Sequence, residues 1–390
     1  MSENRQTERI LAVERFLNGE KPKSIYTSLG RSRSWLYKWI KRFKPDNPSW
    51  HKSESTKPYS NPTRTTSEIE EIVKIIRLNL YNQDLFYGPQ AILWELEDLN
   101  VEPLPSLSTI KRILKRHGLT HRRTGRYEPK GKLYPQLVAA KPNHIHQADF
   151  VGPRYLKGPL RFYSLNIVDV NTARCGIKPL LNRSGQSMLD GLWSIWKRLG
   201  IPCHIQVDNE MVFYGSPTYP RGMGPLIRLC LHYGVEPWFI PVREPWRNGM
   251  VEKFNDHHQQ KFLNKISMTT EKELLQGSLN FEYRHNSKYR YSKLKGQTPL
   301  KALAVSGERL KFPKKEQAPR HPMKKPEGGR YHLIRFIRSD LRLNIFGEIF
   351  PVSPDLEYEY VVATVDVKEQ RLKIFLDNMQ VDDYHYQLRH

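Results

Sequence analysis

Apolar residues near the start of the chain recur at helical spacing in three short runs, and Gly19 and Gly30 break the first two. ERILAVERFLNGE is the first run, KPKSIYTSLG is the second, and RSRSWLYKWIKRF is the third. In the third run Trp35, Trp39 and Ile40 mark one apolar face, with Ser32 or Ser34 in position to cap a helix. The pattern therefore predicts a small helical domain.

Helix, tight turn and basic helix over residues 1–45 resemble a helix-turn-helix motif, whose second helix enters the major groove of DNA. The alternative is a plain three-helix bundle with a solvated basic face. DNA binding is favoured because the basic residues concentrate on the presumed recognition helix, RSRSWLYKWIKRF. The expected DNA contacts are Arg31, Arg33, Ser34, Lys38, Lys41 and Arg42.

A second helical group follows residues 46–67, which are rich in proline, serine and lysine and are typical of a linker. Over residues 68–125, two amphipathic runs precede SLSTIKRILKRHGLTHRR, which has the pattern of another recognition helix. Ser106 or Ser108 would cap this helix. Its apolar residues, Ile110, Ile113 and Leu114, would pack inward. Its basic residues are further expected DNA contacts: Lys111, Arg112, Lys115, Arg116, Arg122 and Arg123.

The pattern changes from about residue 140. Within residues 140–303, HIHQADFVG, RFYSLNIVDV and ARCGIKPLL predict three adjacent strands, and helices then alternate with strands, as in a mixed α/β core. Residues 304–330 are basic and proline-bearing and predict another linker. Residues 331–390 contain five short strands separated by turn signals, which predicts an SH3-like barrel. The expected fold class is multidomain: all-α helix-turn-helix units, an α/β core and a small all-β barrel.

The net charge of +23 indicates a polyanionic partner, with double-stranded DNA the first candidate. Residues 331–390 hold 7 Lys and Arg against 10 Asp and Glu, which leaves +26 for the first 330 residues. The chain has no apolar run of about 18 residues, and its polar start predicts no secretory signal. The cysteines make no CxxC pair, which fits a reducing compartment. We therefore expect a cytoplasmic, nucleoid-associated protein.

Two aspartates lie in or at the end of predicted strands: Asp149 inside IHQADFVG and Asp208 at the end of HIQVDNE. A lone carboxylate at a strand end is usually a cap or a turn former. A first strand and a later strand can nevertheless bring two carboxylates together, and a helix packed alongside could add a third. Such hard oxygen ligands suit two Mg²⁺ ions, with Mn²⁺ as a substitute, for in-line displacement at phosphorus.

Three motifs, QADF, VDNEMVF and NGMVEKFN, resemble in this order the catalytic motifs of DDE transposases and retroviral integrases. LKGQTPLKAL resembles the segment that closes the catalytic core of many bacterial insertion-sequence transposases. The resemblance spans roughly residues 66–380. It implies an RNase H-like core that cuts DNA at transposon ends and joins the 3′ ends to target DNA. Joining two ends to one target implies a homo-oligomer, at least a dimer.

Two glutamates compete for the third metal ligand. The family often places 35 residues between the second aspartate and the glutamate, and this count selects Glu244. Glu244 precedes Pro245, however, which disfavours an α conformation. Glu252 lies in a helical run and at the glutamate position of the family's Gly-x-x-Glu motif, and a Gly/Pro-rich insertion, YGSPTYPRGMGP, accounts for the extra length. The expected catalytic and metal-binding residues are therefore Asp149, Asp208 and Glu252.

Other polar residues surround the expected site. Lys253, His257 and Lys261 are predicted to contact DNA phosphates beside the cut, the alternative being a solvated helix face. Glu210 stands where the resembling proteins commonly have glycine, and its carboxylate either alters metal affinity or points to solvent.

Two other functions stay open at this point. A non-catalytic DNA-binding regulator derived from a transposase is disfavoured by the intact carboxylate set. Another RNase H-like nuclease, acting on RNA–DNA hybrids or junctions, is disfavoured by the tandem helix-turn-helix units. The resemblance also implies that the acidic C-terminal barrel assembles subunits around paired ends, since its charge suits it poorly to binding DNA alone.

Overall fold

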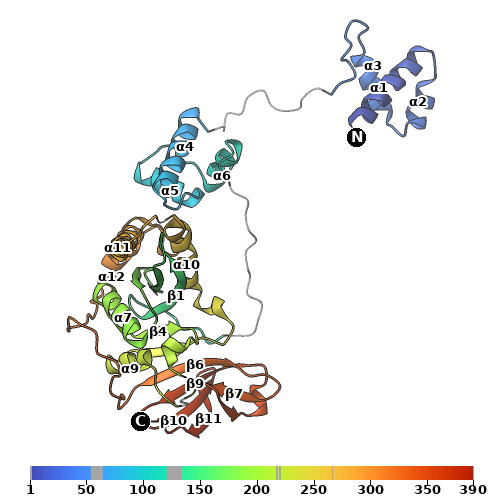
Figure 1. Cartoon of the computed structure of the whole chain (residues 1–390). Coiled ribbons are helices and arrows are strands. Elements are labelled where there is room, and N and C mark those ends of the chain that lie inside the picture. Colours follow the sequence, from blue (N-terminus) through green and yellow to red (C-terminus); the bar gives the residue numbers. More distant parts are fainter. Residues whose placement is uncertain are drawn as a thin grey trace. The chain divides into compact units, whose positions relative to one another are not determined.

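The computed structural model describes residues 2–53, 65–120, 134–216, 218, 221–265 and 267–389 (Figure 1). Contacts divide the chain into two compact units, Met1–Arg64 and Thr65–His390. The finer domain boundaries expected from the sequence stay predictions. In the described residues, no helix is long and apolar enough to cross a membrane.

The first unit is built of three helices, as predicted: α1 (Ser2–Leu17), α2 (Pro22–Ser28) and α3 (Arg33–Arg42). One fully buried residue from each helix forms the core, namely Ala12, Ile25 and Leu36. The side chain of Ser32 accepts a hydrogen bond from the Trp35 amide, so Ser32 is the cap of α3.

The second unit begins with another three helices: α4 (Ser67–Asn82), α5 (Pro89–Asp98) and α6 (Leu107–Arg116). Ser106 caps α6 by accepting a hydrogen bond from the Thr109 amide. The buried side of α6 consists of the predicted residues Ile110, Ile113 and Leu114. The basic residues on either side of them consequently face outward.

The central part is the predicted mixed α/β core. Its strands are β1 (Ile145–Tyr155), β2 (Arg161–Asp169), β3 (Cys175–Leu180), β4 (His204–Val207) and β5 (Glu236–Phe239). β1, β2 and β3 pair antiparallel, while β4 and β5 continue the sheet parallel to β1. Its helices are α7 (Gly185–Leu199), α8 (Met211–Tyr214), α9 (Pro225–His232), α10 (Gly249–Lys261), α11 (Glu271–Lys288) and α12 (Pro299–Ser306). Short 3₁₀ turns in this part are η1 (Pro245–Asn248), η2 (Leu263–Lys265) and η3 (Ser292–Leu294). Another, η4 (Pro354–Leu356), lies in the C-terminal region.

Successive residues of the sheet pack against different helices because side chains alternate along a strand. Ile167 on β2 belongs to the large core that includes α7 and α9. Its neighbour Val168 packs with Val251, Phe254 and Phe281, which come from α10 and α11. The sheet therefore has α7 and α9 on one face and α10 and α11 on the other (Figure 1).

The C-terminal region is rich in strands, but an SH3-like barrel is not confirmed. Its strands are β6 (Arg330–Phe336), β7 (Arg342–Ile345), β8 (Glu348–Pro351), β9 (Tyr360–Asp366), β10 (Arg371–Leu376) and β11 (Met379–His385). β6 pairs parallel with β5, so the described strands form one nine-stranded sheet, β11-β10-β9-β6-β5-β4-β1-β2-β3, beside a β7–β8 hairpin. At the junction the Trp238 ring stacks on His332 with 4.1 Å between centroids.

The predicted basic linker also packs against the core. The Ile201 amide donates to the Lys311 carbonyl at 2.7 Å, and the Trp193 indole donates to the Lys315 carbonyl at 3.2 Å. Arg228 on α9 donates to the Met323 carbonyl. This segment thus follows α7 and α9 to the start of β6.

Leu333→Ala tests whether the C-terminal strands and the core unfold together. Leu333 is fully buried on β6 within the large core, and the substitution should lower the free energy of unfolding by about 2–5 kcal/mol. Differential scanning calorimetry should show one transition for core and tail, shifted to lower temperature. Val381→Ala, on the exposed strand β11, is the control and should change stability by less than about 0.5 kcal/mol. A separate early transition for the tail alone would contradict a continuous sheet.

Candidate active site

The start of α10 is fixed to β1 by side-chain hydrogen bonds. Asn248 at the helix cap makes no capping bond of its own. Instead, the side-chain oxygen Oε1 of Gln147 accepts hydrogen bonds from the backbone amides of Met250 at 2.9 Å and Val251 at 3.2 Å. The Asn248 side chain donates to the Ala148 carbonyl at 3.1 Å. These bonds satisfy amides that a helix leaves free at its start and hold α10 beside the strand that carries Asp149.

Asp149 and Glu252 line the same cavity, whose volume is about 430 Å³. Three other polar residues of α10 line it too: Asn255, Asp256 and Gln259. Spacings of three, four and seven residues place these side chains on one face of the helix with Glu252. The expected first and third ligands therefore face a common space.

Asp149 is held by donors on both carboxylate oxygens. Its Oδ1 accepts from the Phe150 amide at 2.8 Å, and its Oδ2 accepts from the Asn255 side chain at 2.7 Å. Asn255 is itself fixed, because its Oδ1 accepts from Asn166 at 2.7 Å. Asn166 lies opposite Asp149 in the β1–β2 pairing. Sequence reasoning missed both asparagines, although Asn255 lies three residues after Glu252 inside the quoted motif.

Asp208 follows β4, the strand next to β1. The parallel pairing ends with Gln147 opposite Gln206. Asp149 and Asp208 each lie two residues beyond that pair, so they come from matching positions on neighbouring strands. Asp208 Oδ1 accepts a hydrogen bond from the Glu210 amide at 3.0 Å, which closes a turn after the strand.

The three carboxyl groups all have raised pKa values. Burial, and next the charge of Asp208, raise the pKa of Asp149 to about 7, with Glu210 and Glu252 adding to the effect. Burial is also the largest cause for Asp208, whose pKa rises to about 6. The pKa of Glu252 is raised by burial and by the charge of Asp256. Negative charge is therefore concentrated here at an electrostatic cost that a cation would relieve.

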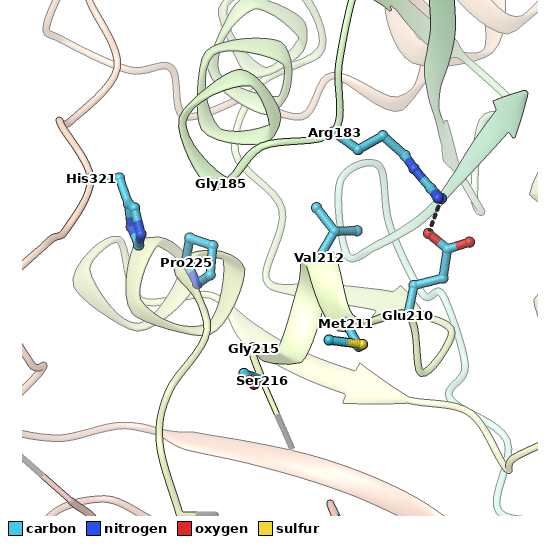
Figure 2. Close-up of a pocket in the computed structure, with 9 residues that line it drawn as sticks. All are labelled: Arg183, Gly185, Glu210, Met211, Val212, Gly215, Ser216, Pro225 and His321. Carbon is cyan, nitrogen blue, oxygen red and sulfur yellow. Dashed lines mark hydrogen bonds and ion pairs between the residues drawn. The ribbon is translucent and has the colours of Figure 1, made fainter. Parts of the chain in front are cut away.

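Glu210 forms an ion pair at the edge of the site. Its carboxylate lies 2.8 Å from Arg183, and Figure 2 shows the two side chains facing one another beside a groove of about 600 Å³. The Arg183 guanidinium also lies 4.9 Å from the centre of the Tyr163 ring. The charge of Arg183 lowers the pKa of Asp208, whereas that of Glu210 raises it. The extra carboxylate is thus partly neutralised within the chain.

The donor set fits Mg²⁺ or Mn²⁺. In the part of the chain that the structure describes, no three His, Cys, Asp or Glu side chains form a group that could hold a metal ion together. Mg²⁺ does not require such a cage, because it usually keeps several waters and binds one or two carboxylates together with substrate phosphates. Asp149 and Glu252 have raised pKa values and line one open cavity, so they would be available as such ligands. The residues that would hold the ions are Asp149, Asp208 and Glu252.

Glu244, the rival third ligand, has other partners. Its carboxylate lies 2.9 Å from the Arg247 guanidinium and accepts from the Tyr360 hydroxyl at 2.8 Å. Arg247 also lies 3.9 Å from the centre of the Tyr134 ring. Glu244 therefore ties the loop before α10 to β9 and is not among the residues lining the Asp149 cavity.

The expected DNA contacts on α3 and α6 are mainly exposed. Arg31 is also paired with Glu8 at 2.6 Å, and Arg116 is paired with Glu70. The exposed members of the predicted set are Arg31, Arg33, Ser34, Lys38, Lys41, Lys111, Arg112, Lys115 and Arg116, with Arg42 half-buried. Arg122 and Arg123 lie outside the described residues.

Two of the three candidates on α10 are engaged inside the chain. The His257 ring stacks on Phe86 with 5.1 Å between centroids, and burial lowers its pKa to about 4, so it is neutral at pH 7. Lys261 lies 3.6 Å from Asp84. Lys253 is exposed. Phe86 and Asp84 belong to the loop between α4 and α5, so this side of α10 meets the second group of helices.

Residues 3–48 match the family model of a homeodomain-like domain. The helix-turn-helix region predicted at the N-terminus is thereby confirmed. No curated protein matches this chain in sequence.

The solved structures that match this chain include viral integrases. The HTLV-2 integrase catalytic core domain in complex with magnesium, in its dimeric form, is 18% identical, with 43% of this chain and 99% of that chain covered and a TM-score of 0.34. Its trimeric form is also 18% identical, with 42% of this chain and 97% of that chain covered and a TM-score of 0.32. A simian T-cell lymphotropic virus intasome in complex with PP2A regulatory subunit B56 gamma is 14% identical, with 73% of this chain and 90% of that chain covered and a TM-score of 0.37.

Asp149→Asn should change the pH dependence of stability in metal-free buffer. The pKa of Asp149 rises from 3.8 to about 7 on folding, so between these values the folded protein binds the proton more tightly than the unfolded chain does. The contribution of the Asp149 carboxyl group to the free energy of unfolding is fully present below pH 3.8 and is lost as the pH rises through 7. In EDTA, the variant should therefore melt several degrees above the wild type at pH 8 and much closer to it at pH 4.5.

The control for this measurement is Asp190→Asn, which changes an exposed aspartate on α7. It should shift the melting temperature by similar amounts at both pH values. An equal effect of Asp149→Asn at both pH values would contradict the raised pKa.

Proposed function

We propose that this chain is a DNA transposase that binds transposon ends, cleaves the DNA to expose 3′ ends and joins them to target DNA. The observation that carries the proposal is the meeting of Asp149 and Glu252 on one cavity, with Asp208 at the matching position of the next strand. The homeodomain-like match at residues 3–48 supports DNA binding. The three sequence motifs that resemble those of DDE transposases contain the same three carboxylates.

In this proposal Asp149, Asp208 and Glu252 hold two Mg²⁺ ions. When bound, such ions supply stabilisation of the attacking and leaving oxygens during in-line displacement at phosphorus. Asn255 and the Phe150 amide orient the Asp149 carboxylate toward the cavity. Because the pKa values of Asp149 and Asp208 in the metal-free protein are about 7 and about 6, cation binding near or below neutral pH would be accompanied by proton release.

The rest of the chain would bind and arrange the DNA. The exposed basic faces of α3 and α6 can neutralise phosphates, and this term dominates sequence-independent affinity. Two ends joined to one target require at least two copies of the chain. The acidic C-terminal strands would contribute orientation between subunits more than affinity for DNA.

The carboxylate set is tested by conservative substitutions. Asp149→Asn, Asp208→Asn and Glu252→Gln should each reduce cleavage and joining by at least about 100-fold, because each removes a metal ligand. Binding to the same DNA should stay within about twofold, since no phosphate contact is lost. The assay would incubate full-length protein and Mg²⁺ with duplexes taken from the DNA flanking its reading frame, and map cut and joined strands.

Glu244→Gln is the matched control, because glutamine keeps the acceptor for Tyr360 and Arg247. It should retain cleavage. An inactive Glu244→Gln beside an active Glu252→Gln would reverse the assignment of the third ligand. Wild-type protein that binds the duplexes without cutting them would indicate a regulator, and preferential cutting of RNA–DNA hybrids would indicate a different nuclease.

Lys111→Ala tests the exposed face of α6 as a phosphate contact. Removing one phosphate contact should reduce the slope of log affinity against log salt by about one unit and weaken binding to all duplexes alike. Fluorescence anisotropy at several salt concentrations would measure this slope. Lys272→Ala, at an exposed position on α11, is the control and should leave it unchanged. Equal slopes for the wild type and Lys111→Ala would remove α6 from the DNA interface.

A further inference from the structure

Arg335, on β6 in the C-terminal region, is a buried arginine with neutral partners. It is 7% exposed. Its Nε donates to the Asn344 carbonyl at 3.0 Å, and its Nη1 donates to the carbonyls of Ile334 at 2.9 Å and Ile240 at 3.3 Å. Its Nη2 donates to Asn209 Oδ1 at 2.9 Å. Within the described residues no carboxylate forms an ion pair with it, and burial lowers its pKa to about 10, so it stays charged at neutral pH.

Burying a charged side chain among neutral partners costs desolvation free energy that hydrogen bonds between strands do not fully offset. An apolar residue of similar volume would often be at least as stabilising at such a place. Hydrogen bonds from a charged donor are, however, stronger than those between neutral groups. Stability alone therefore does not explain a buried arginine at this place. The groups to which it donates indicate what else it does.

Asn209 is the partner whose position matters, because it directly follows Asp208. Arg335 holds its Oδ1, and its Nδ2 donates to the Ile240 carbonyl at 2.6 Å. Arg335 donates to the same Ile240 carbonyl, and the Ile240 amide donates to the Val207 carbonyl at 3.1 Å. The Asn209 side chain is thus bonded at both its oxygen and its nitrogen, between the ends of β4, β5 and β6.

We propose that Arg335 is a positioning residue for Asp208, acting through Asn209. Among the described residues, the Asp208 side chain accepts one hydrogen bond in the turn that follows β4, from the Glu210 amide. Fixing the next residue from β6 sets the direction in which the Asp208 carboxylate leaves the strand. This inference rests on the proposed function, in which Asp208 is a metal ligand. It makes the C-terminal strands part of the catalytic centre of their own chain.

Arg335→Met tests this role by hydrogen exchange and metal binding. In EDTA, amides of residues 208–215 should exchange at least about tenfold faster in the variant, because the turn is no longer held. Affinity for Mn²⁺, measured by calorimetry, should fall about 10–100-fold, the usual effect of losing support behind a metal ligand. Affinity for a 30-base-pair duplex should stay within about twofold, since Arg335 is too buried to meet DNA.

Arg330→Met is the matched control. Arg330 lies on the same strand, but its side chain is largely exposed and pairs with Asp366 at 2.9 Å. It should change neither the exchange of residues 208–215 nor the affinity for Mn²⁺. If Arg335→Met speeds exchange only around its own strand, or leaves Mn²⁺ affinity unchanged, Arg335 is a structural tie and the proposal is overturned.

Asn209→Ala approaches the same contact from the other side and leaves β6 intact. It should reproduce the faster exchange and the weaker Mn²⁺ binding, and it decides the question if Arg335→Met does not fold. The double variant should be no worse than either single one, because both remove one interaction. Effects that multiply in the double variant would count against action through Asn209.

Failure of the proposed function and failure of the Arg335 contact give different experimental results. If the wild-type protein neither binds Mn²⁺ nor cuts DNA, the proposed function is wrong. The exchange measurement in EDTA needs neither property, so slower exchange of residues 208–215 in the wild type than in Arg335→Met would still support the contact, and equal exchange would overturn it.

Discussion

The pairing of β1 with its neighbours is the interaction on which the candidate site depends. β1 is hydrogen-bonded to β2 on one side and to β4 on the other, so its residues cannot shift without breaking two ladders. Three consecutive residues of this fixed strand each make a different contribution to the site. Gln147 accepts the first amides of α10, Ala148 accepts the Asn248 side chain, and Asp149 supplies the carboxylate. Strand register therefore also fixes where the helix that carries Glu252 begins.

Much of this arrangement could be predicted from local patterns. Helical periodicity gave α3 and α6 with their buried and exposed sides, and proline chemistry favoured Glu252 over Glu244. The parallel pairing of β5 with β6 was missed because Trp238 and His332 are far apart in sequence and neither carries a local signal for its partner. β11 was missed because most of its side chains are exposed, which leaves no apolar alternation. The position of His257 depends on packing between separate helices, and one helix's pattern cannot show it.

The electrostatics of the chain follow from two opposite requirements. A strongly basic chain suits a polyanion, whereas the candidate site contains carboxylates whose pKa values are raised mainly by burial and further by neighbouring carboxylates. Arg183 offsets part of that charge through Glu210. The Asp149 carboxylate is instead held by uncharged side chains: Asn255 donates to it, and Asn166 donates to Asn255. Neutral support of this kind fixes a carboxylate without cancelling the charge that makes it a ligand.

The outer edge of β3 has a consequence for how copies of the chain can meet. The strand's outward-facing backbone groups are already bonded to side chains: Cys175 to Asn286, and Ile177 to Glu282 and Arg198. The next outward position is Pro179, which has no amide to donate. A strand from another molecule would find no free donors here, so the sheet cannot be extended into a second subunit at this edge. In the proposed assembly on DNA, copies of the chain would therefore join through helices, loops or the opposite edge of the sheet.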